Sequence, residues 1–410
     1  MLPIQFLAKL SPQLKQYLVI TGNYWAFTLT DGALRMLVVL YFYQLGYSPL
    51  NIAMLFLFYE IFGVVTNLVG GWLGARLGLN KIMNIGLALQ VIALVMLAVP
   101  ADMLTVVYVM AAQALSGIAK DLNKMSAKSS IKLLVPQGDE KAESKLYQWV
   151  ALLTGSKNTL KGIGFFLGGL LLTVFGFKGA VMLMAALLAL VWLFSLVMLK
   201  EDLGKANNKP KFNEMLSKSS AINKLSAARM FLFGARDVWF VVALPVYLAV
   251  TFNWDHWWVG GFMATWVIGY GFVQTVAPLI TGKKATDKTP TGQTAFLWAS
   301  YLIIIAVAIA LVLHFDFYIR TTLIMGLFIF GVVFAINSSL HSYLIVSYAD
   351  SDRVSLDVGF YYMANAMGRL IGTVLSGWVY QHYGLEACLW ISALFVGFAA
   401  FISTKLSRAT

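Results

Sequence analysis

Charged side chains inside long apolar stretches are the residues of this sequence that could do chemistry. Six are cations and three are anions, and a further cation, Arg320, lies nearer the end of its stretch. An ionisable group at bilayer depth is costly unless it faces a cavity and has a partner, so each is a candidate site residue. A multiply charged anion would compensate the surplus of cations, so the sequence predicts an anionic substrate. The cations are Arg35, Lys157, Lys161, Arg229, Arg236 and Arg369, and the anions are Asp31, Glu60 and Asp237.

The spacing of the cations predicts which of them share a helix face. Arg229 and Arg236 are seven residues apart, which places them two turns apart on one face of a helix. Lys157 and Lys161 are four residues apart and share a face of another helix. A guanidinium group binds the oxygens of phosphate, arsenate or carboxylate in pairs, which makes Arg236 the first candidate for substrate binding.

The three carboxyl groups are candidate proton carriers for coupled transport. Asp31 and Arg35 are four residues apart, so we expect them to pair when no substrate is bound. Asp237 follows Arg236 and points about 100° away from it, so it is free to serve another helix. Burial can raise the proton affinity of a carboxyl group, but Asp31, Glu60 and Asp237 can equally be fixed counter-ions. Both interpretations stay open.

Other interpretations of the cations also stay open. Arg229 lies near a cytoplasmic helix end and could extend to the headgroups, and Arg369 follows a glycine-rich run and could only brace helix packing. Lys120 is the deepest member of a basic stripe that repeats every four residues and continues through Lys124, Lys128 and Lys132. The stripe either anchors the cytoplasmic side or concentrates anions at the cytoplasmic mouth. His341, near an inner helix end, is interpreted as ordinary packing.

The elements that position these charges must be membrane-spanning helices. Of 410 residues, 60% are hydrophobic and 12% are charged, against about 25% charged in a soluble chain. The mean hydropathy is +0.78, which excludes a soluble enzyme or a nucleic-acid-binding protein. The long apolar runs show no two-residue alternation, so helices are predicted rather than a barrel. About twelve are expected, at 16–44, 49–74, 82–99, 103–126, 146–175, 179–199, 223–250, 257–281, 294–314, 317–346, 355–380 and 386–404.

Loop charges predict the orientation of these helices and the division of the chain. Lys and Arg gather in alternate loops, whereas the opposite short loops hold one clear lysine, Lys178. The positive-inside rule then places both termini in the cytoplasm and explains most of the +12 net charge without nucleic acid. A polar stretch at 200–222 is the predicted central cytoplasmic loop. It separates a six-helix bundle at 1–199 from another at 223–410.

The loop after the second predicted helix carries a recognisable motif. The sequence GGWLGARLGLNK at 70–81 resembles the signature G-x-L-a-D-R-x-G-R-K of the major facilitator superfamily, with matches at Gly71, Leu73, Arg76 and Gly78. Ala75 stands where the signature has Asp, so the gating salt bridge of that Asp is not carried over. The resemblance implies an all-α membrane protein of twelve helices in two six-helix bundles. It also implies that helices one, four, seven and ten line a central cavity, with two, five, eight and eleven beside them.

The chain further resembles the bacterial organoarsenical exporters, in the segments at 117–132, 229–239 and 260–271. This resemblance implies export of 1-arseno-3-phosphoglycerate across the bacterial inner membrane, which confers arsenate resistance. The functional partner that it implies is the glyceraldehyde-3-phosphate dehydrogenase that makes this compound from arsenate. We expect a monomer in the lipid bilayer. An exchanger of phosphorylated metabolites or an exporter of anionic drugs is the alternative.

The sequence does not favour an enzyme. Neither a nucleophile–base pair nor a metal-ligand constellation is visible at membrane depth, and Cys388 is a single cysteine. We therefore expect no metal and no cofactor. No phosphate-binding loop is visible either, so ATP is not expected to drive transport directly.

Overall fold

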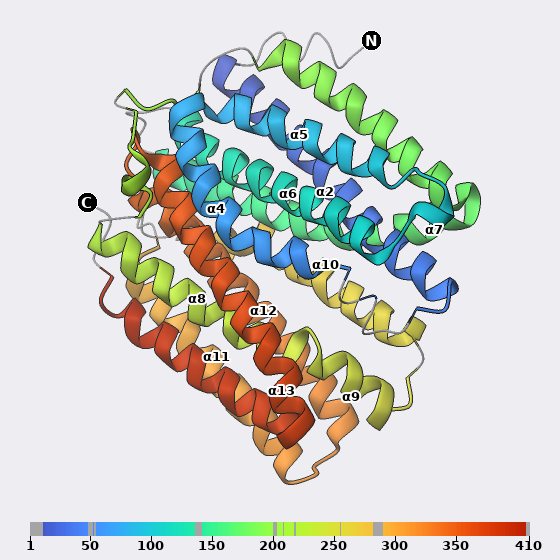
Figure 1. Ribbon diagram of the computed structural model, residues 1–410. Helices are drawn as coiled ribbons and strands as arrows, with labels where there is room; N and C mark the ends of the chain where they lie inside the picture. The colour runs from blue at the N-terminus through green and yellow to red at the C-terminus, as the bar shows by residue number, and fades with distance from the viewer. Residues whose placement is uncertain are drawn as a thin grey trace. The chain divides into compact units, whose positions relative to one another are not determined.

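The regular secondary structure of the computed structural model consists of helices, with no strand among the residues that it describes, which confirms the predicted fold class (Figure 1). These residues are 11–47, 52, 55–135, 142–199, 203–207, 209–216, 219–254, 256–281 and 290–406. The long helices are α2 (Pro12–Gln44), α4 (Leu57–Leu77), α5 (Leu79–Met96), α6 (Val106–Leu134), α7 (Ala142–Met198), α8 (Ser220–Phe240), α9 (Ala243–Thr251), α10 (His256–Thr281), α11 (Gly292–His314), α12 (Ile319–Tyr348) and α13 (Val354–Ser403).

Glycines with positive φ divide the longest helical stretches where the sequence predicts separate spans. Gly176 (φ 65°) breaks α7 between the predicted spans 146–175 and 179–199. Gly384 (φ 77°) breaks α13 between 355–380 and 386–404 in the same way. Gly78 (φ 96°) ends α4 and lets α5 begin at the next residue. A residue with a side chain is strained at such φ values, so these turns depend on glycine.

Within the described residues, nine stretches are long and apolar enough to cross a bilayer. Two of them are the broken helices α7 and α13, and one joins α8 to α9. α6 is absent from the nine, although it has 29 residues, because of the lysines and the aspartate along it. The chain is therefore a multi-pass membrane protein, and α6 is a long helix that carries several charged residues.

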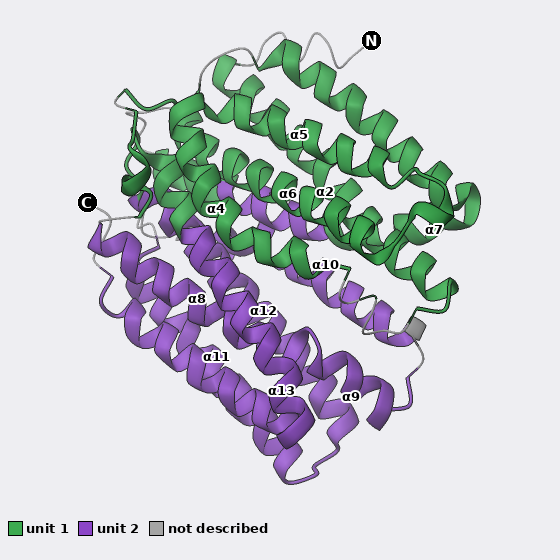
Figure 2. Ribbon diagram, viewed as in Figure 1, with its two compact units in different colours: residues 1–149, 160–216, 349–360 green, residues 150–159, 217–348, 361–410 purple. Residues whose placement is uncertain are grey.

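The chain forms two compact units (Figure 2). Unit 1 comprises residues 1–149, 160–216 and 349–360, and unit 2 comprises residues 150–159, 217–348 and 361–410. In unit 1, α6 packs against α2, α4 and α5, and in unit 2, α12 packs against α8, α10 and α11. The division at 1–199, 200–222 and 223–410 stays a prediction from the loop charges.

Glycines bring the backbones of unit 1 close together and set the positions of its charges. A Cβ on Gly32 of α2 would lie 2.7 Å from the carbonyl oxygen of Lys161 on α7. A Cβ on Gly164 of α7 would lie 2.8 Å from the carbonyl oxygen of Leu29 on α2. Small residues allow this close approach between helices in a membrane. The approach places Lys161 beside the turn of α2 that carries Asp31.

The central polar stretch is tied to unit 1 as far as the structure describes it. Leu79 donates its backbone N–H to Leu203 at 2.7 Å, and Ala206 donates to Ala75 at 2.8 Å. The indole of Trp72 donates to the carbonyl of Pro210 at 3.0 Å. These bonds satisfy backbone groups where α4 ends and α5 begins, so this segment completes the end of the unit.

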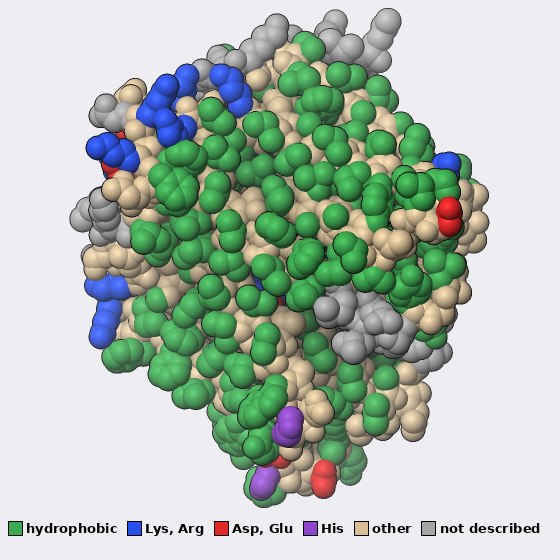
Figure 3. Space-filling view, in the orientation of Figure 1, with side chains coloured by type: hydrophobic (Ala, Val, Ile, Leu, Met, Phe, Trp, Pro, Cys, Tyr) green, Lys and Arg blue, Asp and Glu red, His purple; other side chains and the backbone are tan. Residues whose placement is uncertain are grey.

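Charged side chains gather at helix ends in each unit, and hydrophobic side chains cover the length between them (Figure 3). In unit 2, Lys224 near the start of α8 donates to the carbonyl of Lys405 after α13. At the other end of unit 2, the exposed His314 lies 3.1 Å from Glu386. The cytoplasmic side of Lys224 and Lys405 stays a prediction from the loop charges.

Glycines also set the contact of α8 with α13 in unit 2, and this contact can be tested. A Cβ on Gly372 of α13 would lie 2.7 Å from the carbonyl oxygen of Gly234 on α8. Gly377, on the same helix, has nothing within 4 Å of its Cβ position. We expect Gly372→Ala to destabilise the protein by about 1–3 kcal/mol because the two backbones must separate. Thermal unfolding in detergent measures this effect, with Gly377→Ala as the control that leaves the melting temperature unchanged or raises it. Equal melting temperatures for the two variants would contradict the tight contact.

Candidate functional site

A buried carboxylate in unit 2 holds two arginines from different helices. Asp237 on α8 has no exposed surface. It accepts a hydrogen bond from Nε of Arg236 at 2.6 Å and one from Nε of Arg369 on α13 at 3.0 Å. Asp237 thus serves a second helix through Arg369, and Arg236 also folds back onto it. Arg369 is therefore an ion-pair partner in addition to lying in the glycine-rich packing segment of α13.

Arg229, two turns earlier on α8, is buried among neutral groups. Its exposed fraction is 3%, so the interpretation that it extends to the headgroups is wrong. Its Nε donates to Asn365 Oδ1 at 2.9 Å, and its Nη1 donates to the carbonyl and the hydroxyl of Ser338, both at 3.1 Å. Its guanidinium also lies over the rings of Phe233 and Tyr361. These partners satisfy donors without supplying negative charge.

One phenyl ring lies close to two of the three arginines. The ring centroid of Phe233 is 3.8 Å from Cζ of Arg229 and 4.9 Å from Cζ of Arg236. The two guanidinium carbons are therefore at most 8.7 Å apart, the sum of these distances. Three guanidinium groups and one carboxylate leave a surplus of positive charge among the described residues in this part of unit 2.

A chain of neutral hydrogen bonds extends from Arg229 across unit 2. Ser338, which accepts from Arg229, also accepts from Tyr270 and from Gln274, each at 3.0 Å. The carbonyl oxygen of the Gln274 side chain accepts from Asn158 at 2.5 Å, and Asn158 accepts from Lys157 at 3.2 Å. The predicted site residue Lys157 thus connects to Arg229 through polar side chains from α7, α10 and α12.

In unit 1, Asp31 pairs with a lysine of α7 and a tyrosine of α4. It accepts a 2.6 Å hydrogen bond from the hydroxyl of Tyr59 and lies 3.5 Å from Nζ of Lys161. The predicted pair of Asp31 with Arg35 is wrong, because Arg35 pairs with Glu60 at 3.3 Å. The close glycine contact between α2 and α7 explains the difference, because it places Lys161 next to the carboxylate of Asp31.

Tyr59 is also where the basic stripe of α6 meets the other charges of unit 1. Nζ of Lys120 lies 3.8 Å from the centroid of the Tyr59 ring and 3.8 Å from Oδ2 of Asp121. Asp121 also pairs with Lys124 at 2.5 Å. Lys120 therefore lies beside the group formed by Asp31, Tyr59 and Lys161, as expected for the deepest lysine of the stripe.

The rest of the stripe differs from a row of solvated anchors. Lys128 is 3% exposed, and Lys132 donates to the carbonyl of Ala349. Anchoring at the headgroups therefore does not describe these two lysines, which pack inside unit 1.

The motif residues of the loop between α4 and α5 have structural contacts inside unit 1. A Cβ on Gly71 would lie 2.5 Å from the carbonyl oxygen of Ser355, so this glycine allows a close backbone approach. The guanidinium of Arg76 lies 4.9 Å from the ring centroid of Trp72, and Gly78 makes the turn into α5. Gly71, Arg76 and Gly78 thus shape this helix end and remain a predicted conformational element.

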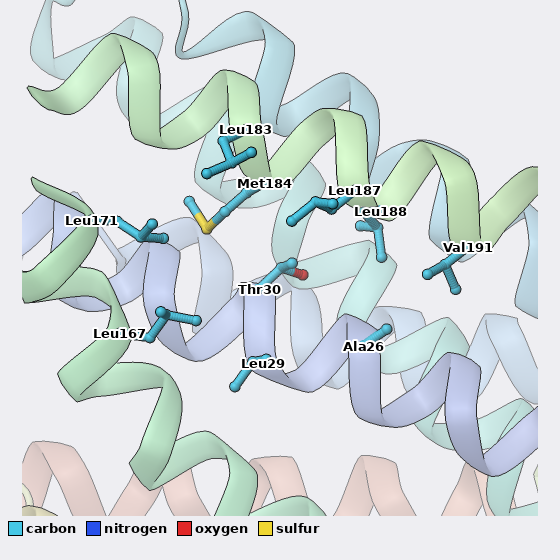
Figure 4. Close-up of a pocket in the computed structure, with 10 residues that line it drawn as sticks. All are labelled: Ala26, Leu29, Thr30, Leu167, Leu171, Leu183, Met184, Leu187, Leu188 and Val191. Atoms are coloured by element: carbon cyan, nitrogen blue, oxygen red, sulfur yellow. The ribbon is translucent and has the colours of Figure 1, made fainter. Parts of the chain in front are cut away.

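An apolar pocket in unit 1 does not suit a charged ligand. It has a volume of about 190 Å³ and lies between α2 and the two halves of α7 (Figure 4). Thr30 supplies the hydroxyl group among its lining residues, and the other nine are Ala26, Leu29, Leu167, Leu171, Leu183, Met184, Leu187, Leu188 and Val191. The candidate site is therefore formed by the charged clusters and not by this pocket.

Several residues of these clusters were not singled out by the sequence. Tyr59, Phe233, Tyr270 and Ser338 are uncharged, so a search for buried charges passes over them. Phe233 lies four residues after Arg229 and three before Arg236, so helical spacing could have identified it. His341, interpreted as packing, is fully buried three residues after Ser338 on α12, and its Nδ1 has no hydrogen-bond partner among the described residues.

Comparisons with known proteins place the chain in one superfamily. The family model described as Major Facilitator Superfamily matches residues 20–354. No curated protein sequence matches the chain significantly.

Solved transporter structures share the fold over almost the whole chain. The transporter FucP in its outward conformation has a TM-score of 0.75 and 11% identity, covering 97% of this chain and 100% of its own. The human organic anion transporter MFSD10 (TETRAN) has a TM-score of 0.74 and 15% identity, with 96% and 100% covered. The proton:xylose symporter XylE has a TM-score of 0.74 and 12% identity, with 96% and 95% covered. At these identities the likeness shows the fold alone.

The role of Asp237 as a counter-ion gives a testable prediction. Asp237→Asn leaves Arg236 and Arg369 without the carboxylate they share, so we expect a loss of about 3–5 kcal/mol in stability. Thermal unfolding in detergent measures the loss, and inorganic phosphate should restore more stability to the variant than to the wild type. Glu386→Gln is the matched control, because it removes an exposed ion pair of little energetic value. The counter-ion role is refuted if the two variants melt alike.

Proposed function

This chain belongs to the Major Facilitator Superfamily, and we propose that it exports a phosphorylated organic oxyanion from the cytoplasm. Members of this superfamily are transporters, so the chain is a membrane transporter and not an enzyme. The observation that carries the proposal is the charge of unit 2, where Arg236 and Arg369 share one carboxylate, Asp237, and the hydrogen-bond partners of Arg229 among the described residues are neutral. Uncompensated buried charge is destabilising, so a bound anion would be strongly favoured there.

The proposed substrate is 1-arseno-3-phosphoglycerate, and the sequence resemblance to organoarsenical exporters supports it. Guanidinium groups bind phosphate and arsenate oxygens equally well because the two ions share a geometry. On this proposal the transporter does no chemistry. The acyl-arsenate bond hydrolyses with water outside the cell, so arsenate leaves the cell as part of a phosphorylated metabolite. The dehydrogenase inside the cell supplies the substrate, and the bacterial inner membrane is the proposed location.

The electrical potential favours this direction of transport. A cell interior that is negative drives each negative charge outward by about 2.3 kcal/mol per 100 mV. Proton coupling is therefore an addition rather than a requirement. Asp237 already accepts from two guanidinium groups, which favours a fixed counter-ion there. Asp31 and Glu60 remain the proposed proton carriers.

An exchanger of ordinary phosphorylated metabolites is the second candidate. The same arginines support it, because a phosphate ester presents the same oxygens as an arsenate ester. MFSD10, which shares the fold, is described as an organic anion transporter. The second candidate therefore also includes export of anionic drugs.

Arsenate resistance distinguishes the two candidates. We expect resistance in arsenate-sensitive bacteria that express both this chain and the dehydrogenase, and none with either protein alone. Growth at graded arsenate concentrations measures it. Resistance from the transporter alone, or protection against arsenite, would contradict the organoarsenical assignment.

Arg236 provides the site-directed form of this test. We expect Arg236→Gln to abolish resistance, because it removes a guanidinium and leaves Asp237 with Arg369 alone. Arg320→Gln is the control: Arg320 is exposed and lies over the rings of Phe252 and Trp254. Immunoblots of membranes confirm equal amounts of the two variants. Full resistance with Arg236→Gln would remove the arginine cluster from the mechanism.

A further inference from the structure

Arg229, Arg236 and Arg369 lie in two places beside α8. One is the Arg236–Asp237–Arg369 group, in which two guanidinium groups share one carboxylate. The other is Arg229, whose hydrogen-bond and ring partners among the described residues are neutral. Among the described residues, each place therefore holds more guanidinium groups than carboxylates. The Phe233 ring contacts both Arg229 and Arg236. The two ring distances show that the guanidinium carbons of these arginines are at most 8.7 Å apart.

Two further polar groups near Arg229 make no hydrogen bond to the described residues around them. Nδ1 of His341 and the hydroxyl of Tyr361 are buried and have no hydrogen-bond partner in the part of the chain that the structure describes. The Tyr361 ring centroid lies 5.3 Å from Cζ of Arg229. His341 follows Ser338, the residue that accepts from Arg229, by three positions and so shares its face of α12.

These groups can all donate to an oxyanion. A phenol donates its O–H, and a neutral imidazole can carry its proton on Nδ1. A buried polar group without a partner is destabilising, and a ligand oxygen between Arg229, His341 and Tyr361 would satisfy these donors together. Such an arrangement is costly in an empty protein and useful to one that binds anions.

We propose that Arg229, His341 and Tyr361 form a second oxyanion subsite, and that Arg236 and Arg369 form the first. The proposed substrate already carries an oxyanion group at each end of a short chain, and the new assignment is that Arg229, His341 and Tyr361 bind the second of these groups. This inference rests on the proposed anion transport and extends it from one charged centre to two. A single-headed phosphate ester fills one subsite and leaves the charge of the other uncompensated.

Stable diphosphates of graded length test the proposal. The probes are propane-1,3-diyl bisphosphate, its homologues with two to eight carbons, and the single-headed propyl phosphate. Binding to the purified protein in detergent is measured by the rise in melting temperature at increasing probe concentration. We expect the best bisphosphate to bind at least about tenfold more tightly than propyl phosphate, with an optimum in chain length.

Two variants locate the second head. Tyr361→Phe removes one hydroxyl and keeps the ring, and His341→Gln keeps a polar group of a different shape. We expect each to weaken binding of the best bisphosphate by about three- to tenfold and to weaken propyl phosphate by less, because that probe can occupy the subsite of Arg236 and Arg369 instead. Tyr301→Phe, at an exposed tyrosine of α11, is the matched control.

The outcomes separate this inference from the function on which it rests. Equal binding of bisphosphates and propyl phosphate, with both variants behaving as wild type, overturns the second subsite and leaves anion transport intact. Failure of every probe to bind overturns the anion site itself. A preference that falls in Tyr361→Phe and His341→Gln but not in Tyr301→Phe supports the two-headed site.

Discussion

The carboxylate of Asp237 is the constraint on which the interior of unit 2 depends. It is fully buried, and guanidinium groups from two helices converge on it. Without it, Arg236 and Arg369 would repel each other in surroundings of low dielectric constant. The contact of Gly372 with the backbone of Gly234 brings the same two helices together, so packing and charge act on one interface. One carboxylate between two arginines stabilises the fold, and on the proposed function the remaining positive charge would bind an anion.

Unit 1 balances its charges more closely than unit 2. Several of its cations have a carboxylate partner: Arg35 pairs with Glu60, Lys161 with Asp31, and Lys120 and Lys124 with Asp121. Tyr59 connects these pairs, because its hydroxyl bonds to Asp31 and its ring faces Lys120. Unit 1 therefore offers carboxyl groups that could exchange protons, and unit 2 offers excess positive charge. On the proposed function, proton exchange would belong to unit 1 and anion binding to unit 2.

The sequence predicted the helices well because apolar length and glycine breaks depend on local pattern. The positions of Gly176 and Gly384 agree with the expected breaks, and the family model supports the fold that the motif at 70–81 suggested. The partners of the charges were harder to predict. Spacing within one helix paired Asp31 with Arg35, whereas a contact between α2 and α7 gives it Lys161. Such a choice depends on which helices approach most closely, which a single helix does not encode.

The sequence also did not predict that an arginine would be buried among neutral side chains. Arg229 looked like a residue at a helix end, because its position in the sequence says nothing of Ser338 and Asn365 on other helices. The same limit applies to His341, which lies near a predicted helix end but has its ring inside unit 2. The pattern of charged and apolar residues predicts where a residue lies along a helix. The packing of the helices determines which side chains surround it.

The charge along α6 has a consequence for biogenesis. Lysine at the centre of an isolated helix opposes insertion by about 2.5–3.5 kcal/mol per residue on translocon scales. α6 carries Lys120, Lys124 and Lys128 beside Asp121, and Lys120 also lies over the ring of Tyr59 on α4. The helix is therefore poorly suited to enter the lipid on its own. It should leave the translocon together with the preceding helices, so that an insertion intermediate of unit 1 holds several helices before any of them meets lipid on all sides.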